Sequence, residues 1–162
     1  MRTRGVVKHL TSTTLALALL CGCSSDGRYS SARSHIRRLI PGGARRLEQS
    51  DTHGGFHGDG RLWQVYELPG ELASRFREGA ADSANWQPLP LPDELRRLSG
   101  MYHDRLPWNA GAGFYYFHDF QPEWYPDYES LARPVADRPS CNFLIIIFDS
   151  RSGKIFVDNL DT

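Results

Sequence analysis

The sequence predicts an α+β fold in which one main helix packs on an antiparallel sheet of about five strands, in the order β-β-α-β-β-β. Apolar side chains alternate along residues 61–68, which is the pattern of a strand with two different faces. Residues 142–148 form an almost unbroken apolar run, which is typical of a central strand covered on both faces. Leu72 and Phe76 share one side of residues 71–78, as in an amphipathic helix.

Turn signals and strand patterns place the remaining elements. One strand precedes the Gly-rich segment that ends in Asp59-Gly60, which is a tight-turn signal. The region after the helix is rich in proline, and we expect it to be irregular except for a short helical stretch. A long aromatic loop with four prolines then leads to the central strand, and a hairpin containing Gly153 leads to the last one. We therefore expect strands at 44–51, 61–68, 113–119, 142–148 and 154–160, a helical turn at 93–98 and a loop at 120–140.

The first 22 residues have the composition of a bacterial signal peptide. Three basic residues are followed by an apolar stretch at 15–20, which is too short to span a bilayer. The sequence Leu20-Cys21-Gly22-Cys23 resembles the lipobox of bacterial lipoproteins, in which the cysteine becomes the new N-terminus. The resemblance implies that Cys23 carries a diacylglycerol and an N-acyl chain. Three such chains would anchor the mature protein stably in a membrane.

Two alternatives remain at this terminus. Cys21 is the competing lipidation site, but the leucines before it do not supply the small residue that the lipobox requires. An ordinary secretory signal with an incidental cysteine pair is the second alternative. Ser24 follows Cys23, whereas an Asp at that position would resemble a signal for retention in the inner membrane. We therefore expect a lipid-anchored protein of the bacterial cell envelope, in the outer membrane and facing the periplasm.

Residues 23–43 are predicted to be a flexible, basic tether ahead of a single globular domain at 44–162. The first half of the tether is small and polar, and a short helix is expected at 34–40, either packed on the domain or lying on anionic lipid. Residues 23–50 contain six arginines and two acids, a net charge of +4, whereas residues 51–162 have a net charge of −7. An acidic domain is not expected to bind nucleic acid.

Cys141 is the only thiol that remains once Cys21 is removed and Cys23 is lipidated, which excludes an intramolecular disulfide. Cys141 lies beside the apolar run, and we interpret it as a small buried hydrophobe. An intermolecular disulfide or a nucleophile are the alternative interpretations.

One segment, residues 51–60 (Asp-Thr-His-Gly-Gly-Phe-His-Gly-Asp-Gly), carries residues suited to chemistry. Its candidate site residues are Asp51, His53, His57 and Asp59, which suit either a zinc site or a histidine base oriented by a carboxylate. Four glycines exclude the helix on which zinc motifs usually present their ligands. We therefore interpret the segment as an elaborated hairpin loop without a metal, with ligand binding and catalysis as the alternatives.

The same segment is part of a wider resemblance. Residues 51–60, the aromatic stretch 113–117, the run 142–149 and the C-terminal Leu160-Asp161-Thr162 together resemble a family of small uncharacterised bacterial exported proteins and lipoproteins. The resemblance covers about residues 45–162. It implies that this region is one folding unit, and it assigns no activity and no site.

The sequence favours a binding module over an enzyme. It contains no Ser/His/Asp elbow, no Walker loop and no dinucleotide fingerprint. Aromatic side chains in the loops suit recognition of a protein or a glycan. We therefore predict a non-catalytic envelope module without a cofactor, of which an immunity-type inhibitor is one variant. The alternative function is a small metal-dependent or acid/base hydrolase that uses Asp51, His53, His57 and Asp59.

Overall fold

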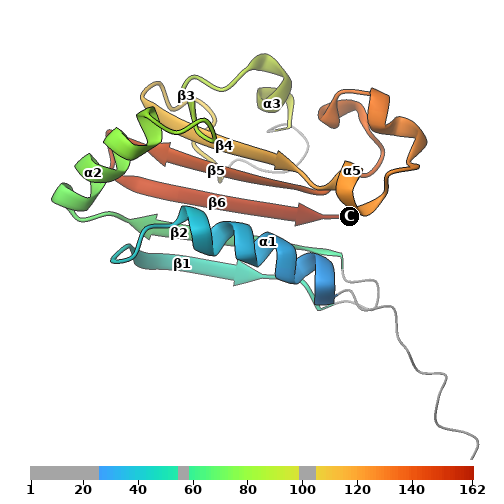
Figure 1. Cartoon of the computed structure of the whole chain (residues 1–162), viewed down its shortest axis with the longest axis horizontal. Helices are drawn as coiled ribbons and strands as arrows, with labels where there is room; N and C mark the ends of the chain where they lie inside the picture. Colours follow the sequence, from blue (N-terminus) through green and yellow to red (C-terminus); the bar gives the residue numbers. More distant parts are fainter. Residues whose placement is uncertain (1–25, 55–58, 99–104) are drawn as a thin grey trace, which may run out of the picture.

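A computed structural model describes residues 26–54, 59–98 and 105–162. These residues form a six-stranded, fully antiparallel sheet with helices on both faces, which confirms the predicted α+β class (Figure 1). Across the sheet the strands follow the order β1-β2-β6-β5-β4-β3. Their bounds are β1 Arg45–Asp51, β2 Gly60–Glu67, β3 Gln87–Pro88, β4 Gly113–Asp119, β5 Phe143–Asp149 and β6 Lys154–Asp161.

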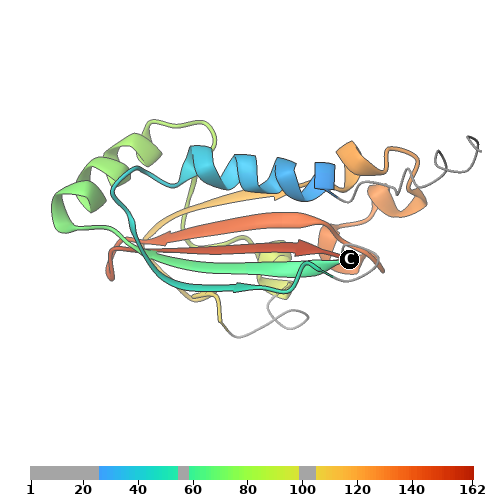
Figure 2. The same cartoon turned by 90° about the horizontal axis from the view of Figure 1, so that it is seen from below.

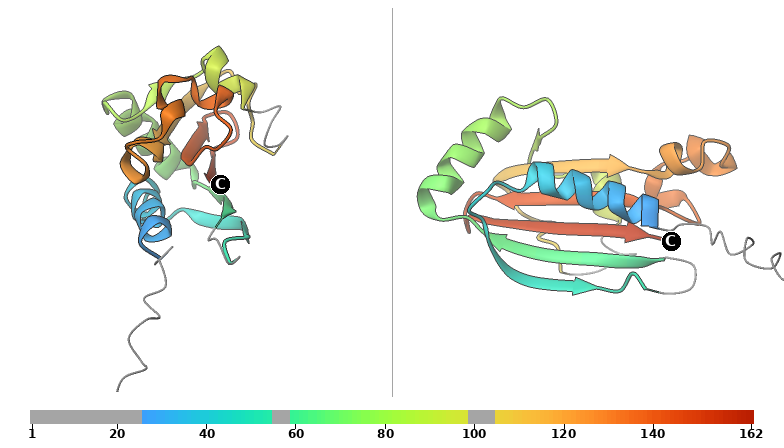
Figure 3. Two further views of the ribbon diagram at one scale, coloured as in Figure 1. Left: turned by 90° about the vertical axis from the view of Figure 1, so that its right-hand side faces the viewer. Right: turned by 60° about the horizontal axis from the view of Figure 1, so that its bottom comes forward.

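The centre of the sheet is made by strands from the two ends of the domain. β4, β5 and β6 follow one another as a meander, and β6 then pairs with β2, which forms a hairpin with β1. Residues 143–148 of β5 are fully buried, as the unbroken apolar run predicts. The strands lie side by side in this order in the right-hand view of Figure 3.

Helices cover the sheet on both sides. α1 (Asp26–Leu39), α2 (Gly70–Ala81) and the short α5 (Gln121–Trp124) lie over one face, and α3 (Asp93–Arg97) lies over the other (Figure 2). Two 3-10 turns, η1 (Glu129–Ala132) and η2 (Val135–Asp137), lead into β5. Each face therefore has its own apolar core, and alternate residues of β5 and β6 contribute to each.

The structure corrects the prediction of a flexible tether at residues 23–43. Fourteen of these residues form α1 instead, and the helix expected at 34–40 is only its C-terminal half. Ala32 and Ile36 are 0% and 5% exposed, because their spacing of four residues places both on the side that faces the sheet. The polar composition of the segment hides this narrow apolar stripe.

Three other predictions change in detail. β3 adds a sixth strand where we expected irregular structure, and its proline is tolerated because the strand lies at the sheet edge. The expected loop at 120–140 contains α5, η1 and η2. The main helix is confirmed, although α1 makes it one of two.

Cys141 is fully buried and not in a disulfide, which fits its interpretation as a small hydrophobe.

Across the described ranges, no helix combines the length and the apolar character needed to span a membrane.

Candidate functional site

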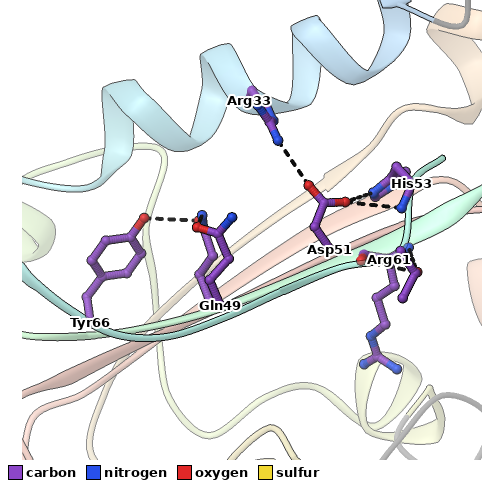
Figure 4. Close-up of polar contacts among 8 residues, drawn as sticks. Arg33, Gln49, Asp51, His53, Arg61 and Tyr66 are labelled. Carbon is purple, nitrogen blue, oxygen red and sulfur yellow. Dashed lines mark hydrogen bonds and ion pairs between the residues drawn. The ribbon is translucent and has the colours of Figure 1, made fainter.

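The Gly-rich loop between β1 and β2 brings two of its predicted site residues into contact. Asp51 is the last residue of β1, and its Oδ1 accepts a hydrogen bond from the backbone N–H of His53 at 3.1 Å. The same oxygen lies 3.0 Å from Nδ1 of the His53 ring. The other carboxylate oxygen, Oδ2, forms an ion pair with Arg33 of α1 at 2.9 Å (Figure 4). Asp51 thus ties the start of the loop to the helix above it.

The Asp51–His53 pair has the contacts of a carboxylate that orients a histidine base, but its surroundings indicate a structural corner. An Asp that accepts a hydrogen bond from the backbone two residues later is a common turn motif. The His53 side chain is only 5% exposed, and both oxygens of Asp51 are engaged. A base needs access to a substrate proton, and this imidazole is largely enclosed.

Glycine is required where the loop returns to β2. A Cβ on Gly60 would lie 2.6 Å from the backbone nitrogen of His53 and 2.7 Å from its Cα, which no side chain tolerates. Beside this contact, the N–H of Thr52 donates to the carbonyl of Arg61 at 3.0 Å. The close approach of the two strands explains why Gly60 stands at this position of the loop.

The other predicted site residues do not add to this corner. Asp59 is exposed and directly precedes β2. His57 and the proposed lipidation site Cys23 lie outside the described residues. Within the ranges that the structure describes, no group of three or more His, Cys, Asp or Glu side chains is arranged to hold a metal ion.

Two enclosed ion pairs lie on the face of the sheet that is opposite α1. Nε of Arg61 donates to Oδ1 of Asp158 at 2.5 Å, and Asp158 is fully buried. Arg138 binds Asp119 of β4 at 2.6 Å and also donates to the carbonyl of Leu131 at 3.2 Å, which fixes the segment after α5. Because each charge has a close partner, these pairs contribute to the structure of the domain.

A second cluster of titratable side chains forms where α1 crosses β4. Nδ1 of His35 lies 3.0 Å from the hydroxyl oxygen of Tyr116, and the rings of His35 and His118 are 4.6 Å apart. Nε2 of His118 in turn lies 2.9 Å from Oε1 of Glu123 in α5. The cluster therefore joins three elements that are distant in the sequence.

This environment favours the neutral forms of two of these groups. The pKa of His35 is lowered, mainly by burial and further by His118 and Arg38, while Glu123 opposes the effect. The pKa of Tyr116 is raised, again mainly by burial.

A groove of about 480 Å³ lies along the outer edge of β4. Four consecutive residues of β4, Tyr115 to His118, line one side of it. The other walls come from the turn after α2, with Asn85, from β3, with Gln87, and from α3, with Glu94 and Leu95.

The outer edge of β4 is open along most of this groove. β3 pairs only with Phe114 and Tyr115, at one end of β4 (Figure 1). Beyond Tyr115, no strand in the described part of the chain pairs with this side of β4. The groove therefore combines an open strand edge with side chains from both faces of the sheet.

No pattern in the sequence points to this region as a site. His35 and Tyr116 are 81 positions apart, so no local pattern reports their contact. The available signal was Tyr116 and His118, which share one face of a strand because they are two residues apart. An isolated pair of this kind does not distinguish a site from ordinary packing.

In the comparisons with known proteins, no protein-family model, curated protein or solved structure matches the chain. Its function is therefore inferred from its own residues and geometry.

Proposed function

We propose that the protein is a non-catalytic binding module of the bacterial envelope, attached to the membrane through Cys23, which holds a partner protein in the groove beside β4. The groove is the observation that supports binding. It is a concave site of about 480 Å³ with aromatic side chains of β4 on one side and polar groups such as Asn85, Gln87 and Glu94 on the others, and ligands bind preferentially in concave sites of this size. An open strand edge favours a polypeptide partner over a glycan, because it presents main-chain hydrogen-bonding groups.

The N-terminal part of the sequence supports the proposed location. A basic start, an apolar stretch and the lipobox-like Leu20-Cys21-Gly22-Cys23 support export and lipidation at Cys23. Ser24 after the cysteine supports the outer membrane, with the domain in the periplasm. The resemblance to small exported bacterial proteins and lipoproteins is in keeping with this location.

The anchor is tested with a Cys23→Ala variant expressed in a bacterium that processes lipoproteins. Wild-type protein should incorporate radiolabelled palmitate and show the mass of an acylated Cys23. The variant should accumulate as an unprocessed precursor without label. Normal maturation of the variant would exclude lipidation at Cys23, and a Cys21→Ala variant run beside it identifies the alternative site.

The binding surface is tested by filling the groove. Ala84 lines the groove and is exposed, so Ala84→Trp places an indole in it without disturbing the core. Ala81→Trp is the matched control, since Ala81 is exposed at the end of α2 and does not line the groove. We expect the partner crosslinked to the wild type in intact envelopes to be at least tenfold depleted with Ala84→Trp and retained with Ala81→Trp. Equal capture by both variants would place binding elsewhere.

A second candidate function is acid/base hydrolysis at the Gly-rich loop, and the 3.0 Å contact between Asp51 and His53 favours it. If it is correct, Asp51→Asn should abolish hydrolysis of p-nitrophenyl esters with little loss of stability. In the metal-dependent version, purified protein should contain stoichiometric zinc, and a chelator should lower Tm. No hydrolysis, no metal and a destabilised Asp51→Asn variant would leave Asp51 with a structural role only.

A further inference from the structure

The backbone N–H and C=O groups of β4 point alternately toward β5 and toward the open edge. The carbonyl of Gly113 accepts a hydrogen bond from the N–H of Leu89, on the β3 side, at 3.0 Å. The N–H of Phe120 donates in the opposite direction, to the residue that precedes β5. Because successive residues of a strand direct their backbone groups to alternate edges, Phe117 and Asp119 direct both N–H and C=O outward. Neither residue has an outward strand partner in the described part of the chain.

These groups match the main chain of another strand. A donor and an acceptor on each of two alternate residues form the repeating unit of an antiparallel ladder. Addition of an extended peptide to such an edge is a known mode of recognition, in which main-chain hydrogen bonds provide affinity. The free part of β4, Tyr116 to Asp119, has room for about four residues of an added strand at about 3.3 Å per residue.

The side chains of β4 flank this edge on both faces. Tyr115 and Phe117 pack against the core that α3 covers, and Tyr116 and His118 lie on the face that α1 covers. All except Tyr116 are partly exposed. An incoming strand would therefore place successive side chains beside aromatic rings on alternate faces.

The charge of the groove bears on which peptides it would accept. Glu94 is exposed on its wall, and its Oε1 is oriented by a hydrogen bond from the N–H of Val135 at 3.2 Å. None of the described residues that line the groove is lysine or arginine. The whole region from residue 51 to 162 has a net charge of −7. A basic side chain near Glu94 is therefore favoured and an acidic one is disfavoured.

We propose that β4 binds an extended segment of a partner protein as an added edge strand, with a lysine or arginine of that segment beside Glu94. This inference rests on the proposed binding function of the groove, and it specifies the form of the partner.

The first experiment uses peptides as the probe. Random nine-residue peptides displayed on phage are selected against the full chain in detergent, and the selected peptides are synthesised for anisotropy measurements. We expect basic peptides whose affinity falls at least tenfold when alternate backbone amides are N-methylated, because methylation removes the donors of the ladder. N-methylation of the intervening amides is the control and should have a smaller effect. Selected peptides that tolerate methylation at every amide would overturn the proposal.

The second experiment changes the protein edge. Phe117→Pro removes an outward N–H and leaves the β4–β5 ladder intact, since proline is tolerated at sheet edges. Phe117→Ala removes the same ring but keeps the N–H, so it is the matched control. We expect at least tenfold weaker peptide binding for Phe117→Pro than for Phe117→Ala, both with native circular dichroism. If Phe117→Pro does not fold, the N-methylated peptides still decide the question.

The third experiment tests the charge and the alternative occupants. Glu94→Gln should weaken basic peptides several-fold and lose much of their salt dependence. A dimer in sedimentation experiments that Phe117→Pro dissociates, together with no peptide binding, would replace the partner peptide by a second copy of the chain. Capture of an envelope partner that Ala84→Trp blocks and Phe117→Pro does not would overturn the added strand while keeping the proposed function.

Discussion

The sheet has unpaired backbone groups along β1 and along the open part of β4, and the side chains around them differ. β1 is exposed along all of its seven residues and carries Arg45, Arg46, Glu48 and Asp51, with a register irregularity between Arg46 and Glu48. The open part of β4 is shorter, partly buried and aromatic, and the carboxylate of Asp119 is bound to Arg138.

The difference shows how an edge is protected or made available. Long exposed edges are templates for aggregation, and charges and bulges are the usual protection against it. β1 has both features. The edge of β4 lacks this protection, but the walls of the groove limit access to it. Under the proposed strand addition, an edge that is recessed in this way would exclude folded surfaces and admit a narrow strand.

The largest effect is expected in the sheet that joins the two edges. Asp158→Ala leaves Arg61 without its buried partner and should lower the free energy of unfolding by about 3–5 kcal/mol. Glu67→Ala removes an exposed pair with Arg45, close to the β1 edge, and should cost no more than about 1 kcal/mol. Urea denaturation measures both variants. Equal losses of unfolding free energy in the two variants would mean that the buried Arg61–Asp158 pair stabilises the domain no more than the exposed pair does.

The next effect is expected at the start of β4. Gly113 has φ +129°, and a Cβ there would lie 1.9 Å from the carbonyl oxygen of Phe148. Gly113→Ala should therefore cost about 1–3 kcal/mol from backbone strain, with an added cost from the clash, and should weaken binding at the β4 edge. Gly111→Ala is the control, because its nearest neighbour would be 3.8 Å away. Thermal unfolding should give a lower Tm for Gly113→Ala than for Gly111→Ala. Equal Tm values would show that a Cβ at position 113 causes no strain.

A smaller effect is expected from pH, through the contact between α1 and β4. The lowered pKa of His35 means that the unfolded chain binds a proton more readily than the folded one. Stability should therefore be greatest above the ordinary value of 6.5, fall as the pH decreases below it, and level off once His35 is protonated in the folded state too. His118, Glu123, Tyr116 and Arg38 face this group and set the size of the effect.

Urea denaturation between pH 7.5 and pH 5 measures this slope. His35→Asn should be less stable at pH 7.5 but should show a flatter pH dependence than the wild type. Parallel curves for the two proteins would show that other groups carry the acid dependence. The raised pKa of Tyr116 predicts the opposite sign at high pH, where stability falls as the pH rises above 10.

The smallest effect on stability is expected at the β1 edge itself. Arg45→Val and Arg46→Val together remove two charges from exposed positions, and stability should change by only about 0.5–1 kcal/mol. Self-association should nevertheless increase, since the edge loses part of its protection. Sedimentation velocity at rising concentration measures this, and an unchanged monomer would show that the register irregularity and the remaining charges of Glu48 and Asp51 are enough to protect β1.

Local patterns predicted most of the sheet. Alternation in β2, the apolar run in β5 and the turn before β6 each report a structure that neighbouring residues determine. The sequence predicts only part of α1 because few of its residues face the core, and it does not indicate β3 because two residues show no periodicity. The Asp51–His53 contact joins two residues of one loop, so the sequence of that loop is enough to indicate that the two side chains lie close together. The His35–Tyr116 contact depends on the tertiary fold, which no local pattern contains.

The start of α1 has a consequence for how the domain would sit at a membrane. Asp26 begins the helix three residues after Cys23, and three residues span about 10 Å at most. If Cys23 carries acyl chains, the folded body would stay within a headgroup's reach of the lipid and could not extend far into the periplasm. A partner protein in the same leaflet would then be met by two-dimensional diffusion, and segments held close to the bilayer would meet the domain most often.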